Sequence, residues 1–148
     1  MIVRLDHVGV VAHSLEEASA ALVDGLGFPL DTRRTRMPEG NLFKPENTRI
    51  WFVSVGEGET QIEILIPQDT VSGIAKYLAK RGPGLHHLGY AVDSVEDDAR
   101  VLSGRGLARI PLGPDANAAF FYPKTVMGIL TELVPMRTLE RVHSAQPR

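Results

Sequence analysis

The hydrophobic positions along the chain form short strand-like runs that alternate with helical stripes. Residues 3–12 are mostly apolar and β-branched, which predicts a strand. Ser14 then begins a capping-box pattern with Glu17, and apolar residues recur at helical spacing until Gly27. Further strands are expected around 30–35 and at 49–55 and 60–66, the last two joined by a turn at 56–59 that favours a hairpin.

The same order recurs in the second half of the chain. A strand is predicted at 85–92, a helix after Ser94, and strands at 108–110, 118–122 and 129–134. Strand–helix units often look alike, but three matched positions in matching context favour a true repeat. The matched pairs lie 80 residues apart and are His7 and His87, Gly9 and Gly89, and Ser14 and Ser94.

The chain is therefore interpreted as one α+β domain made of two similar modules. A helix is expected between them, capped by Asp69 or Thr70 and ending near Gly82. The expected limits are module 1 at 1–67, a linking helix at 69–82, module 2 at 83–136 and a polar C-terminal tail at 137–148.

Composition removes several classes of function. The 148 residues suit a single domain, and 43% hydrophobic with 23% charged residues is ordinary globular usage. A net charge of −2 argues against nucleic-acid binding, and the lack of cysteine excludes disulfides and thiolate chemistry. No signal peptide or long apolar run is seen, so no membrane span and a cytoplasmic location are expected.

Two histidines and two glutamates are the candidate metal ligands. His7 and His87 occupy equivalent strands, while Glu63 and Glu132 interrupt apolar strands, where an unpaired carboxylate is costly. Each glutamate could instead face solvent, because strand residues alternate between faces. Gln61 shares the face of Glu63 and could replace it, although a charged carboxylate is the better ligand. Mixed nitrogen and oxygen donors suit Co²⁺, Ni²⁺, Mn²⁺, Fe²⁺ or Zn²⁺.

The other histidines rank lower as candidates. A regular strand would turn His86 to the face opposite His87, and His13 and His143 fall in an expected loop and the tail. No catalytic triad order, P-loop or dinucleotide fingerprint is present.

At these residues the chain resembles the vicinal-oxygen-chelate superfamily of glyoxalase I, bleomycin-resistance proteins and extradiol dioxygenases. Within it, the resemblance is greatest to the methylmalonyl-CoA epimerases. The helix that runs into Gly84-Leu85-His86-His87 is the most specific element. The segments that carry the resemblance are 5–10, 63–67, 74–87, 122–124 and 128–134.

The resemblance implies paired βαβββ modules that form a curved mixed sheet around a metal. The family's ligand positions match His7, Glu63, His87 and Glu132, with Glu63 placed by its distance to Pro67. Residues 37–48 and 112–117 depart from the family pattern, and Tyr122 replaces its histidine. Arg49 stands where some epimerases carry a glutamate proposed as an acid or base.

The activity implied by the resemblance is a metal-dependent 1,1-proton transfer on methylmalonyl-CoA or a similar malonyl thioester. Glu132 is the expected acid or base on one face, and the second is unassigned. Lys76, Lys80, Arg81 and Lys124 could meet CoA phosphates, and a homodimer is expected from relatives. The alternatives are a glyoxalase I-type isomerase, a dioxygenase, or a protein that sequesters a small molecule without turnover.

Overall fold

The computed structural model, described over residues 1–113 and 116–137, is built around one curled eight-stranded mixed sheet. The elements in chain order are β1 (Ile2–Val11), α1 (Leu15–Ser19), the π-helical turn η1 (Ala20–Gly25), β2 (Asn41–Phe43), the 3₁₀ turn η2 (Lys44–Glu46), β3 (Thr48–Ser54), β4 (Gln61–Pro67), α2 (Gly73–Arg81), β5 (Gly84–Val92), α3 (Val95–Gly104), β6 (Arg109–Ile110), β7 (Ala119–Phe121), the 3₁₀ turn η3 (Pro123–Thr125) and β8 (Thr131–Pro135).

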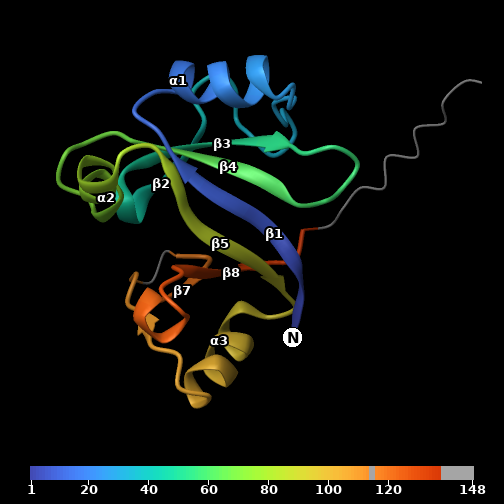
Figure 1. Ribbon diagram of the computed structural model, residues 1–148. Coiled ribbons are helices and arrows are strands. Elements are labelled where there is room, and N and C mark those ends of the chain that lie inside the picture. The colour runs from blue at the N-terminus through green and yellow to red at the C-terminus, as the bar shows by residue number, and fades with distance from the viewer. Residues whose placement is uncertain (114–115, 138–148) are drawn as a thin grey trace, which may run out of the picture.

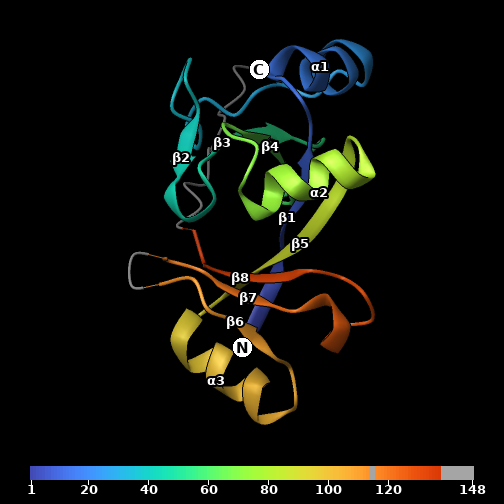
Figure 2. The ribbon, with the colours of Figure 1, turned by 90° about the vertical axis from the view of Figure 1, so that its left-hand side faces the viewer.

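The strand order shows the repeat directly. It reads β2-β3-β4-β1-β5-β8-β7-β6, so the strands of the first half lie on one side and their counterparts lie in mirrored order on the other. The halves join through β1 and β5, which pair antiparallel, while β4 and β8 lie parallel to β1 and β5 respectively. Figures 1 and 2 show this central pair with α1 at one end of the molecule and α3 at the other. The expected paired-module fold is confirmed, whereas the module limits stay a prediction.

Alternation along the strands separates the face covered by α1 and α3 from the inner face, part of which α2 covers. Ile64 and Ile66 on β4 pack with Ala18 of α1, and Leu133 on β8 packs with Ala99 of α3. The intervening residues Glu63 and Glu132 therefore face the other way, toward the side where Figure 2 shows α2 in front of β1 and β5. Helices α1 and α3 thus bury the outer apolar face and leave the carboxylates on the inner side, beside α2.

Two local expectations are corrected, the strand at 30–35 and the start of the linking helix. The segment at 30–35 forms only an isolated bridge between Leu30 and Val53, and β2 lies further on, within residues 37–48. The linking helix begins later than expected, because Ser72 caps it by accepting from the Ala75 amide. Asp69 instead accepts from the amides of the turn before the helix. The predicted tail lies outside the described residues except for Arg137.

Candidate metal centre

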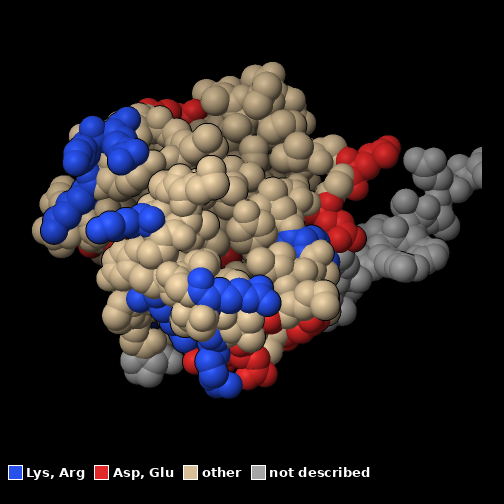
Figure 3. Space-filling view, turned by 60° about the horizontal axis from the view of Figure 1, so that its bottom comes forward, with Lys and Arg blue, Asp and Glu red and all other residues tan. Residues whose placement is uncertain are grey.

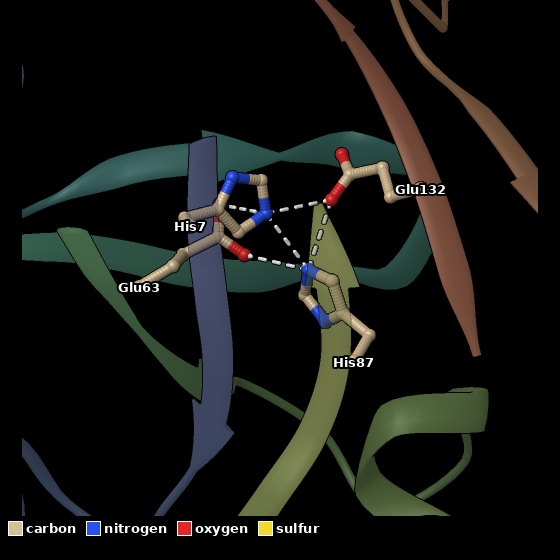
Figure 4. A group of neighbouring side chains, drawn as sticks. All are labelled: His7, Glu63, His87 and Glu132. Carbon is tan, nitrogen blue, oxygen red and sulfur yellow. Dashed lines mark hydrogen bonds and ion pairs between the residues drawn. The ribbon is translucent and has the colours of Figure 1, made fainter. Parts of the chain in front are cut away.

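The four candidate ligands meet at one point, although they come from four strands. His7 lies on β1, Glu63 on β4, His87 on β5 and Glu132 on β8, and each is less than 8% exposed. One donor atom from each lies within 4.8 Å of every other (Figure 4). The structure therefore brings all four together from both modules.

The donor atoms have the separations expected of neighbours around one cation. The Nε2 atoms of His7 and His87 lie 2.9 Å apart, and Glu132 Oε2 is 2.8 Å from the first and 2.9 Å from the second. Glu63 lies 3.4 Å from His87 Nε2 and 3.7 Å from His7 Nε2. Two nitrogens each about 2.0–2.1 Å from a shared ion have comparable spacing. Two imidazoles and two carboxylates also form a suitable donor set for a divalent transition metal.

Each histidine lies over a glycine of the opposite module. In the β1–β5 pairing, His7 is opposite Gly89 and Gly9 is opposite His87. A Cβ atom at Gly89 would lie 2.1 Å from the His7 ring, and one at Gly9 would lie 2.2 Å from the His87 ring. The repeated His-x-Gly pattern thus has a steric reason, because only glycine leaves room for the ring across the strand pair.

Gln61 does not belong to this cluster. Its carbonyl oxygen accepts from Arg34 at 2.8 Å, and its amide nitrogen donates to Asp31 at 2.6 Å. These contacts hold the Gln61 side chain in a separate polar network, so the carboxylate that approaches the histidines is that of Glu63.

The mutual charges of the cluster shift its protonation. Burial alone would lower the pKa of His7, but Glu63, Asp6 and Glu132 together raise it to about 10. Burial would raise the pKa of Glu132, yet its bonds to His7 and His87 lower it to about 2. Burial raises the pKa of Glu63. Without a cation, a proton held on His7 at neutral pH thus balances part of the carboxylate charge.

The residues before both histidines also enter the site. Burial would raise the pKa of the Asp6 carboxyl, but bonds from His7 and Arg34 hold it well below its usual range. His86 contacts His87 rather than pointing away, which corrects the expectation from a regular strand. Burial and the neighbouring His87 lower the pKa of His86 to about 3.

A mostly apolar cavity of about 270 Å³ opens from the cluster. Glu63, His87 and Glu132 form part of its wall, and three further ionisable residues also line it, namely Glu46, Tyr77 and His86. The apolar lining comes from both modules and includes Phe43, Ile50, Leu65, Ile74, Phe120 and Leu130. The cavity adjoining the cluster can therefore receive a small substrate with an apolar part.

Glu46 is a functional candidate that the sequence analysis did not single out. It ends η2, where its carboxylate accepts from the Ile74 amide at the start of α2 (3.2 Å). Arg49, which was expected to stand where some epimerases carry a glutamate, donates to the Gly40 carbonyl at 3.5 Å. In the sequence, the one indication for Glu46 is that it lies in residues 37–48, which depart from the family pattern.

The two modules share one curled sheet, and two imidazoles and two carboxylates meet at its midline. This combination of fold and candidate metal centre is typical of one superfamily. The chain belongs to the Glyoxalase/Bleomycin resistance protein/Dioxygenase superfamily, which its residues 6–122 match. The family expected from the sequence is thereby confirmed.

Similar proteins include named epimerases. The chain is 31% identical over 142 residues to the ethylmalonyl-CoA/methylmalonyl-CoA epimerase of Cereibacter sphaeroides, covering 90% of this chain and 98% of that protein. The structure of methylmalonyl-CoA epimerase from Mycobacterium tuberculosis superposes with a TM-score of 0.77 at 30% identity, covering 93% and 91% of the two chains. An uncharacterised Bacillus subtilis protein, YqjC, is 25% identical over 135 residues, covering 88% of this chain and 90% of that protein.

No helix in the described ranges, 1–113 and 116–137, is long and apolar enough to cross a membrane.

Proposed function

We propose that the protein is a metal-dependent epimerase of methylmalonyl-CoA or a similar 2-substituted malonyl thioester. The observation that carries this proposal is the buried cluster of His7, Glu63, His87 and Glu132, which opens into a cavity lined by additional acid–base groups. Epimerase relatives at about 30% identity support the choice of reaction.

The four clustered side chains are the proposed ligands of one divalent ion. When bound, the ion supplies Lewis-acid polarisation of the substrate's carboxylate and thioester oxygens, which favours charge on those oxygens. The two histidines and two glutamates would hold such an ion beside the cavity.

Inversion of the α-carbon needs proton exchange on both of its faces. One carboxylate takes the α-proton, the C–H electron pair moves toward the adjacent carbonyl oxygens, and a carboxylic acid on the other face returns a proton to carbon. Glu132 is the proposed group on one face. Glu46 is the proposed group on the other, because its carboxylate lines the same cavity and arises from a different element.

The cavity suits the reacting end of the substrate better than a whole CoA thioester. Its volume of about 270 Å³ falls below the range of about 300–1,000 Å³ usual for pockets that hold complete drug-sized ligands. The remainder of CoA would then lie outside, and exposed Lys76, Lys80 and Arg81 on α2 could contact its phosphates. Figure 3 shows basic side chains gathered at the left edge, the side on which α2 lies in Figure 1.

The proposal is tested by exchange of the α-proton of methylmalonyl-CoA in heavy water. The native protein should catalyse exchange, EDTA should abolish it, and added Co²⁺ should restore it. Glu46→Gln should slow the exchange, whereas Glu57→Gln in the exposed turn after β3 serves as the matched control. Absence of exchange with metal present would reject this substrate, and a metal-free protein indifferent to EDTA would point to sequestration.

The homodimer and the cytoplasmic location belong to this proposal as predictions. Sedimentation of the purified protein measures the first, and fractionation of cells that express it measures the second.

A further inference from the structure

The residue before each clustered histidine is the extra residue of a β-bulge. Along the β1–β5 pair, Leu5 is opposite Tyr90 and His7 is opposite Gly89, so Asp6 has no partner of its own. Further along, Gly9 is opposite His87 and Val10 is opposite Leu85, so His86 is the extra residue on the other strand. A bulge interrupts alternation and redirects a side chain. Both modules therefore use the same backbone device, 80 residues apart.

Both extra residues contact the far nitrogen of the histidine that follows. Asp6 Oδ2 lies 2.8 Å from His7 Nδ1, and His86 Nδ1 lies 2.9 Å from His87 Nδ1. The opposite nitrogens, both Nε2, face each other and Glu132 in the cluster. Each histidine is therefore held at one ring nitrogen and offers the other to the centre.

Ligation determines which atom donates in these two contacts. A neutral histidine that gives its Nε2 lone pair to a cation carries its hydrogen on Nδ1. His7 Nδ1–H then donates to the Asp6 carboxylate, and His87 Nδ1–H donates to the unprotonated Nδ1 of His86. The acceptors differ, because the first is an anionic carboxylate and the second is a neutral imidazole.

Both acceptors are themselves held in place. Asp6 is fully buried and also accepts from Arg34 Nη2 at 2.5 Å and Arg137 Nε at 3.0 Å. His86 packs edge-on against Tyr77 with ring centres 4.7 Å apart. The Tyr77 hydroxyl in turn donates to the Leu85 carbonyl at 2.7 Å. Both acceptors therefore have further contacts that favour the observed orientation toward their histidines.

We propose that Asp6 and His86 are matched positioning residues that fix the tautomer and ring orientation of His7 and His87 toward a metal ion. The inference depends on the metal centre proposed above and not on the identity of the substrate. Both residues act through the histidines, since their contacts to the cluster are made at Nδ1. Loss of such a partner typically weakens metal affinity by about 10–100-fold.

The test is a titration of the metal-free protein with Co²⁺, followed by visible absorption. His86→Phe keeps an aromatic ring against Tyr77 but removes the acceptor, and it should weaken Co²⁺ binding by about 10–100-fold. His86→Asn loses the ring but places an amide oxygen near the position of Nδ1, and it should restore affinity close to the native value. Asp6→Asn should fall between native and His86→Phe, because an acceptor remains while its charge is lost.

A purely packing role for His86 predicts the reverse order, with His86→Asn binding more weakly than His86→Phe. His13→Asn, at an exposed histidine, is the control for loss of an imidazole. Equal affinity of native protein and His86→Phe, or the reversed order, overturns the inference. A native protein that binds no Co²⁺ overturns the metal centre and the inference together, whereas failure to exchange methylmalonyl-CoA protons affects only the proposed substrate.

Discussion

Replacement of Gly89 by alanine should displace the ring of His7 without straining the backbone. The new Cβ would lie 2.1 Å from His7 Cε1 and 2.4 Å from Nε2, whereas ordinary contacts begin at 3.4 Å. The difference between 3.4 and 2.1 Å requires the ring or strand to move by about 1.3 Å. Gly89 does not have a positive φ, so alanine suits the backbone and the effect is steric.

A displacement of this size exceeds what a metal centre tolerates. Ligand distances in metal sites vary by only about ±0.2 Å, and a misplacement of about 1 Å can reduce function about 100-fold. Overpacking of a well-packed interior costs about 1–3 kcal/mol, which is about 2–12 °C in Tm for a chain of this size. Gly89→Ala should therefore remain folded at 25 °C but bind Co²⁺ at least about 100-fold more weakly.

The assay combines a Co²⁺ titration with thermal unfolding of the metal-free protein. Gly104→Ala is the control, because a Cβ there meets nothing within 4 Å and the position also lacks a positive φ. Gly9→Ala should reproduce the effect through His87, since its Cβ would lie 2.2 Å from that ring. A folded Gly89→Ala protein with native Co²⁺ affinity would refute the steric argument and the role of His7 as a ligand.

Three further predictions concern the same centre. Glu132→Gln should keep most of the fold but lose α-proton exchange; near-native exchange, measured by NMR in heavy water, would remove its assigned role. Because the pKa of His7 is raised to about 10 in the metal-free protein, an ion that binds at neutral pH must displace a proton from it. Co²⁺ affinity should therefore rise by up to about tenfold per pH unit between about pH 6 and 8. Calorimetric titrations that give the same affinity across this range would contradict this prediction. With free Co²⁺ at about 100 times its dissociation constant, excess EDTA should lower the Tm by about 5–10 °C, equivalent to about 2.7 kcal/mol; an unchanged Tm in calorimetry would argue against a bound ion.

The fold and the convergence of the four side chains were accessible from the sequence because duplication marks equivalent positions. The 80-residue spacing aligned His7 with His87, and alternation indicated that Glu63 and Glu132 interrupt buried strands. The choice between Gln61 and Glu63 needed coordinates, because both lie on one face and only the contacts of Gln61 with Arg34 and Asp31 separate it from the cluster.

The expectations that were wrong depended on irregular backbone. Strict alternation placed His86 on the outer face, but an extra residue in β5 interrupts that alternation. The residue types around this bulge do not indicate it in the sequence. Strand β2 has only three residues, too few for a periodic pattern, and it is defined by pairing with β3. The sequence alone did not single out Ser72 as the cap, since Asp69, Thr70 and Ser72 are all chemically capable of capping a helix.

The antiparallel alignment of β1 with β5 has an approximate twofold axis, since His7 opposes Gly89 while Gly9 opposes His87. Each module contributes one imidazole and one carboxylate, so a solitary module holds half of the donors. Two copies of one ancestral module, associated across the same axis, would have assembled an equivalent centre as a dimer. Within one polypeptide the two modules have a high effective concentration, and each carries a different residue beside its histidine, a carboxylate beside His7 and an imidazole beside His87.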